Sequence, residues 1–205
     1  MMKTMISSLA GIILLFSTSA PLLAAVATDP QEIVKQTTMQ VLNTLRTEGN
    51  AIQKDPQRLY QLINELILPH FDFRQMSKWV LGRYWRNASE SQRGDFTRQF
   101  ELLLVRTYSD ALVEFRDQSV AFLPTRERSD TEVTVRSTVN RGSGPAVLIT
   151  YRMHKVGADW KVYDVATEGI SLVINYRSSF AHEIRRNGID GLIRQLARKN
   201  QSARG

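Results

Sequence analysis

Three histidines and a few carboxylates are the side chains of this sequence that could perform acid–base chemistry. The histidines are His70, His154 and His182, and no two of them lie three or four residues apart. The spacing of a helical metal site is therefore absent. His70 and Asp72 flank a single residue and could form a base with its orienting acid. A polar loop explains that pair more simply, so these residues give little support for catalysis.

Two segments of glycine and serine also fail to match a nucleophile site. A strained turn that exposes a nucleophilic serine has the pattern Gly-x-Ser-x-Gly between a strand and a helix. The sequence instead has Gly142-Ser143-Gly144, which is typical of a turn, and Gly169-Ile170-Ser171, which is typical of a strand end followed by a helix cap. Asp164 and Glu168 could still act in a cone-shaped pocket, together with His70. A small-molecule enzyme therefore stays open as an alternative.

The absence of cysteine removes several kinds of site. The chain of 205 residues has no cysteine, which excludes disulfides, iron–sulfur clusters, thiolate zinc sites and cysteine nucleophiles. The sequence also contains no phosphate-binding glycine loop. We therefore predict a protein that is not an enzyme, with no catalytic residue, no metal and no cofactor.

The first 27 residues are typical of a secretory signal peptide. Lys3 is their only charged residue, the stretch 5–23 is apolar or small, and Ala25-Val26-Ala27 offers a cleavage site. A short apolar run before small residues marks such a peptide. We expect residues 1–27 to be removed and residues 28–205 to form a single soluble domain in the periplasm of a Gram-negative cell.

Helical periodicity dominates the beginning and the end of this domain, and an alternating pattern fills its middle. Gly49 is predicted to end the first helix. The predicted helices span residues 30–48, 56–68, 73–84, 89–115 and 171–187, with a last short helix capped by Asp190. The predicted strands span residues 118–124, 131–140, 146–155 and 160–167. Turn sequences between the strands indicate an antiparallel meander of about four strands, so the fold class is α+β.

Basic side chains gather near the C-terminus. The formal net charge is +7, and residues 177–205 hold seven basic and two acidic side chains. In a secreted protein this favours anionic head groups or an acidic protein partner over nucleic acid. We expect docking through Arg185, Arg186, Arg194 and Arg198, although a solvated helix surface explains the charge equally well.

Three segments of the sequence share a resemblance to one protein family. They are ELILPHFDFRQMSKWVLGRYWRNASESQR (65–93), YDVATEGISLV (163–173) and GIDGLIRQLARKN (188–200). In order and spacing they resemble the MlaC-type periplasmic phospholipid-binding proteins, also called toluene-tolerance auxiliary proteins. The resemblance covers essentially the whole mature chain.

The resemblance implies a fold and a function. The fold is a twisted antiparallel sheet, wrapped by N- and C-terminal helices around a deep apolar cavity for the acyl chains of a glycerophospholipid. The function is to shuttle lipid between an outer-membrane lipoprotein–porin complex and an inner-membrane ABC transporter with a ring-forming substrate-binding subunit. This transport maintains outer-membrane lipid asymmetry. We expect a monomer, and a periplasmic chaperone or interaction module with a solid core is the other alternative.

We expect the inward faces of strands and helices to line the cavity. Acyl chains are recognised by volume, so their surroundings must be apolar. The predicted wall residues on strands are Val133, Val135, Val147, Ile149, Tyr151, Met153, Tyr163 and Val165. Those on helices are Leu66, Phe71, Val80, Phe100, Leu104 and Tyr108.

Overall fold

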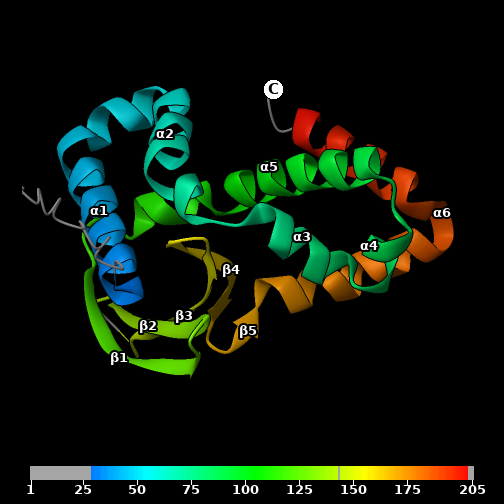
Figure 1. Ribbon diagram of the computed structural model, residues 1–205. Helices are drawn as coiled ribbons and strands as arrows, with labels where there is room; N and C mark the ends of the chain where they lie inside the picture. The colour runs from blue at the N-terminus through cyan, green and yellow to red at the C-terminus, as the bar shows by residue number, and fades with distance from the viewer. Residues whose placement is uncertain (1–28, 143, 203–205) are drawn as a thin grey trace, which may run out of the picture.

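The computed structural model describes residues 29–142 and 144–202 (Figure 1). The predicted signal peptide lies outside these residues. Within them, no helix is both long enough and apolar enough to cross a membrane. The helices stand before and after one antiparallel sheet, which confirms the α+β prediction.

Each of the first two helices of the described chain is capped by an aspartate at its N-terminus. Helix α1 (Pro30–Lys54) begins at Asp29, whose carboxylate accepts a hydrogen bond from the backbone N–H of Gln31. Asp55 ends α1 and caps α2 (Pro56–Leu62) in the same way. The prediction that Gly49 ends α1 is wrong. Gly49 is instead buried within α1, where a Cβ would lie 3.2 Å from the guanidinium of Arg116.

The chain leaves α2 through two irregular turns. The segment η1 (Ile63–Ile67) is a π-helix, and η2 (Leu68–His70) is a 3-10 helix. Pro69 has no N–H to continue a helical ladder, and Phe71 then forms an isolated parallel bridge with Val162. This segment therefore turns toward the sheet, and π-turns of this kind are frequent at functional sites.

Four further helices pack together in a helical lobe (Figure 1). They are α3 (Phe73–Leu81), α4 (Arg83–Asn87), α5 (Glu90–Glu114) and α6 (Leu172–Ser202). Helix α5 extends from this lobe toward α1 and the sheet (Figure 1). Ser89 and Gln92 make the predicted capping box at the start of α5. Helix α6 is kinked at Gly188, so its two halves match the two helices predicted there.

The sheet is an antiparallel meander in which each strand pairs with its neighbour in sequence. Its order is β1-β2-β3-β4-β5, with a fifth, two-residue strand beyond the four expected. The strands are β1 (Ser119–Ser129), β2 (Glu132–Asn140), β3 (Val147–Val156), β4 (Asp159–Thr167) and β5 (Ile170–Ser171).

A bulge in β4 changes which side chains face inward. Tyr151 pairs with Val165, whereas Met153 pairs with Val162, so one strand carries an extra residue between these two pairs. Such a bulge reverses the alternation of side chains on either side of it. Val162 therefore faces inward with Val165. Tyr163 joins the helical lobe, where its ring stacks on that of Trp79 with centroids 6.3 Å apart.

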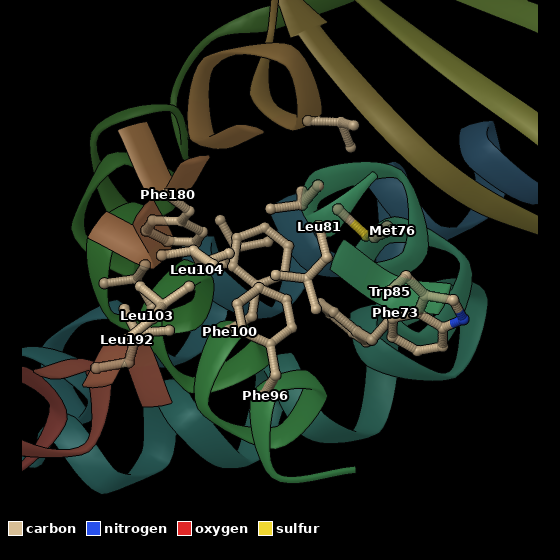
Figure 2. Packing of buried hydrophobic residues seen from close by; sticks show 14 of the residues in the cluster. Phe73, Met76, Leu81, Trp85, Phe96, Phe100, Leu103, Leu104, Phe180 and Leu192 are labelled. Carbon is tan, nitrogen blue, oxygen red and sulfur yellow. The ribbon is translucent and has the colours of Figure 1, made fainter. Parts of the chain in front are cut away.

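Three clusters of buried side chains hold these elements together. The largest lies inside the helical lobe, where Phe96, Phe100 and Phe180 pack ring against ring (Figure 2). A second joins the inner face of the sheet to Val34 of α1. The third lies between α1 and α2 and includes Leu45.

Candidate functional site: an apolar cavity

A cavity of about 320 Å³ lies between the inner face of the sheet and three helical segments. Helix α1, the η1–η2 turns and the C-terminal half of α5 form most of its helical sides, to which α3 and the start of α6 contribute, and strands β1 to β4 form the remaining wall. Ligand pockets for drug-sized molecules begin at about this size. The curvature of the sheet and the irregular turns after α2 thus leave a space that side chains do not fill.

The wall of the cavity carries no charged side chain of the acidic or basic type. Among the described residues that line it, none is lysine, arginine, aspartate or glutamate. Its hydroxyl groups include that of Thr38, which donates to the backbone carbonyl of Val34 at 2.7 Å. Because a charged or unpaired polar ligand would lose its hydration here, the wall suits hydrocarbon.

The titratable groups on the wall are held in their neutral forms. Burial raises the pKa of Tyr151. Burial, with the neighbouring Tyr176 hydroxyl, raises the pKa of Tyr108 to about 12. Burial and then the charge of Lys161 lower the pKa of His70 from 6.5. All three shifts favour the uncharged side chain at neutral pH, so the cavity stays electrically neutral.

The cavity opens at one end. Met76 and Val162 are buried at its floor, whereas Tyr108 is 37% exposed and Thr167 is exposed. Leu172, at the start of α6, also lines it. The mouth therefore lies among the C-terminal half of α5, the end of β4 and the start of α6.

The structure places six of the fourteen predicted wall residues on this cavity. They are Phe71, Leu104, Tyr108, Ile149, Tyr151 and Val165. Their contact with lipid stays a prediction. The other eight do not line the cavity, and they are Leu66, Val80, Phe100, Val133, Val135, Val147, Met153 and Tyr163.

These eight residues lie in packed regions for identifiable reasons. Val80 and Phe100 belong to the helical lobe, one turn or more away from the cavity. Val133, Val135 and Met153 face the same way as the wall but lie farther along the strands, where Val34 and Trp160 cover them.

The remaining three are separated from the cavity by local geometry. Tyr163 is turned to the other side by the bulge in β4. Leu66 packs on the cluster between α1 and α2. Val147 is buried at the start of β3, opposite Val139, which does line the cavity.

The largest contribution that sequence reasoning missed comes from α1. Its face at helical spacing, Ile33, Val34, Thr37, Thr38, Val41 and Leu42, lines the cavity. Ile63 and Ile67 of the π-helix do so as well. The apolar period of residues 30–48 was the available signal. It shows that a face is buried, but it does not distinguish a face against solid core from a face against a cavity.

The carboxylates considered for catalysis are engaged elsewhere and do not line the cavity. Asp72 lies 3.0 Å from His154 Nε2 and caps α3, so it is not paired with His70. Asp164 accepts hydrogen bonds from Ser171 Oγ and from the backbone N–H of Val173. These contacts hold chain segments in place.

Glu168 also has a structural contact, because its carboxylate accepts a hydrogen bond from the backbone N–H of Leu148 at 2.6 Å. Across residues 29–142 and 144–202, no three acidic or histidine side chains form a group that could hold a metal ion.

The predicted docking arginines lie on α6 and are exposed. Arg194 and Arg198 share a polar hollow with Glu183 and Asn187. Their half of α6 runs beside the N-terminal half of α5, where Asn200 Nδ2 donates to the carbonyl of Gln99 at 2.9 Å. Because the cavity borders the other half of α5, the arginines and the cavity occupy separate parts of the molecule.

Comparison with known proteins identifies related chains of the same size. The model of the MlaC protein family matches residues 35–198. The toluene tolerance protein ttg2D of Pseudomonas putida is 28% identical over 97% of this chain and 96% of its own. The intermembrane phospholipid transport system binding protein MlaC of Haemophilus influenzae is 25% identical over 84% of this chain and 83% of its own.

A solved structure has the same fold. It is the phospholipid-binding protein from Ralstonia solanacearum in complex with a phospholipid, with a TM-score of 0.79 and 36% sequence identity. The match covers 87% of this chain and 100% of that one. Because the family model spans most of the chain and the solved structure shares its architecture, this chain belongs to the MlaC protein family.

Proposed function

We propose that this protein is a phospholipid-binding transport protein whose cavity encloses acyl chains and leaves the head group at the mouth. The neutral, apolar wall is the observation that carries the proposal. Family membership and the phospholipid held by the Ralstonia solanacearum protein support it. A solid-core interaction module does not fit a cavity of this size.

The physical need for such a cavity follows from the hydrophobic effect. Two acyl chains contain roughly thirty methylene groups, and each contributes about 0.8 kcal/mol when it is removed from water. A phospholipid therefore crosses an aqueous gap very slowly without a carrier. Chain binding requires apolar volume and no bond breaking, so the carrier needs no catalytic residue.

The place and partners of this transport form the finer part of the proposal. The Haemophilus influenzae relative is named for an intermembrane phospholipid transport system, and the first 27 residues have the composition of a signal peptide. We place the protein in the periplasm, between an outer-membrane lipoprotein–porin complex and an inner-membrane ABC transporter with a ring-forming subunit. Arg185, Arg186, Arg194 and Arg198 are the proposed docking side chains.

Native mass spectrometry and organic extraction of the purified protein test lipid binding. We expect the wild-type protein to carry phospholipid and Ile149→Asp to carry none, because the new carboxylate would face acyl chains. Thr150→Asp is the matched control, since adjacent strand residues point to opposite faces. Thr150 does not line the cavity.

Two results would contradict the proposal. One is a wild-type spectrum that shows only the bare polypeptide, with no lipid in the extract. The other is equal lipid content in the Ile149→Asp variant and the wild type, which would mean that the cavity is not the binding site.

A further inference from the structure

The segment Tyr163–Ser171 contains an unusually tight turn next to the cavity. Strands β4 and β5 are joined by a two-residue turn, Glu168-Gly169, in which both residues have positive φ angles of 51° and 81°. A turn with positive φ at both positions is the tightest hairpin connection, and it disfavours a residue such as glutamate. The chain nevertheless has glutamate at the first turn position.

Hydrogen bonds that the two carboxylates of this segment accept fix the turn and the start of α6. The Glu168 carboxylate accepts from the backbone N–H of Leu148 on β3, 2.6 Å away. The buried Asp164 accepts from Ser171 Oγ at 2.7 Å and from the backbone N–H of Val173 at 3.2 Å. Ser171 Oγ in turn accepts from the backbone N–H of Ile174. The junction from β4 to α6 is therefore held in one arrangement.

This junction presents Ile170 beside the mouth of the cavity. Ile170 pairs with Thr167, and Thr167 lines the cavity, so Ile170 lies on the cavity side of the sheet. Leu172, two residues later, lines the cavity as well. Ile174 is 58% exposed, but it follows Leu172 by two residues in α6, so it lies on the side of the helix that faces away from the cavity. Ile170 is 67% exposed. No other large hydrophobic side chain in the described part of the chain is as exposed.

We propose that Ile170 forms a lip that contacts the acyl chains of a phospholipid as it enters or leaves the cavity. The proposal rests on the proposed function, because it concerns the same ligand. A chain that leaves the cavity exposes its methylenes to water one after another. An apolar surface at the mouth covers the first of them, which lowers the barrier to exchange without changing the affinity of the fully enclosed lipid.

A transfer assay separates exchange rate from lipid content. The mature protein is loaded with a phospholipid that bears a fluorophore on one acyl chain. It is then mixed with vesicles of phosphatidylethanolamine and phosphatidylglycerol that contain a lipid-linked quencher, and the loss of fluorescence gives the transfer rate. We expect Ile170→Ser to transfer lipid at about one fifth of the wild-type rate or below. The amount of lipid bound per protein should be unchanged.

Two variants control for general effects. Ile174 is exposed to a similar degree on the side of α6 that faces away from the cavity, so Ile174→Ser should transfer lipid at the wild-type rate. Ile170→Leu keeps the lip apolar and should also retain that rate.

Each result bears on one proposal. An unchanged rate in the Ile170→Ser variant would overturn the lip, and so would equal slowing in the Ile174→Ser control. Loss of bound lipid in the Ile170→Ser variant would show that Ile170 belongs to the resting site, which also contradicts a role in exchange alone. If the wild-type protein takes up no lipid, the proposed function itself fails.

Discussion

At the scale of single residues, Asp164 is a carboxylate of a type that can act in catalysis, but here it holds chain segments together. Its carboxylate is buried and accepts hydrogen bonds from Ser171 at the end of β5 and from Val173 at the start of α6. Arg152 lies 3.3 Å away on the neighbouring strand. A carboxylate with all these contacts has no free oxygen directed at a ligand. The YDVATEGIS motif therefore encodes a structural junction beside the cavity.

The substitution Asp164→Ala tests this role. It would leave Ser171 and the N–H of Val173 without their acceptor in a buried position, so we expect a loss of about 3 kcal/mol in the free energy of unfolding. Urea denaturation measures it. Asp110→Ala on the exposed side of α5 is the control and should change stability by less than about 0.5 kcal/mol. Equal stability of the two variants would show that the Asp164 contacts contribute nothing.

At the scale of elements, the bulge in β4 and the kink in α6 decide which faces meet. The bulge turns Val162 toward the cavity and Tyr163 toward the helical lobe. The kink at Gly188, with φ of 70° and ψ of 176°, turns the C-terminal half of α6 back along α5. Both irregularities are local, yet each redirects a whole segment.

Gly188→Ala tests the kink. An L-residue with a side chain is strained at this φ and ψ, so we expect a loss of about 1–2 kcal/mol in unfolding free energy. Gly94→Ala, inside α5, is the matched control because a Cβ there meets no atom within 4 Å. That change should raise stability by about 0.5–1 kcal/mol through helix propensity. Opposite signs for the two substitutions are the expected outcome, and a stabilising Gly188→Ala would contradict the kink.

At the scale of the whole molecule, the cavity and the proposed docking arginines lie in separate places. The cavity borders the C-terminal half of α5, and the arginines of α6 accompany its N-terminal half. Arg194 and Arg198 form no ion pair with a carboxylate among the described residues. Exposed charges of this kind act mainly by long-range attraction, which salt screens over about 8–10 Å.

Reversing both charges, Arg194→Glu with Arg198→Glu, should slow association with anionic vesicles and weaken its dependence on salt. Lipid per protein should stay constant, since buried methylenes supply that affinity. Stopped-flow association at several ionic strengths and lipid extraction measure the two effects. Arg126→Glu with Arg128→Glu on β1 makes the same change in net charge at exposed positions and should slow association less. Loss of lipid with unchanged association would place the head group at Arg194 and Arg198.

The sequence by itself determined the class of fold, the order of the elements and the family. Period and turn chemistry are local properties, so the helices and the four longer strands could be predicted from the residues that form them. The identity of the cavity wall was partly predictable, because alternation placed Ile149 and Tyr151 on the inner face of β3. Alternation also placed Tyr163 on that face, and only the pairing of β4 with β3 revealed the extra residue that turns it away.

Only the tertiary structure decided which buried faces line the cavity and which pack in solid core. Val34, Val41 and Leu45 of α1 share one apolar pattern, yet the first two line the cavity and Leu45 lies in solid core. The sequence could not separate them, because an apolar side chain is removed from water in both places and the pattern records only that removal. The difference depends on the distance between α1 and the curved sheet, which packing against non-local segments sets.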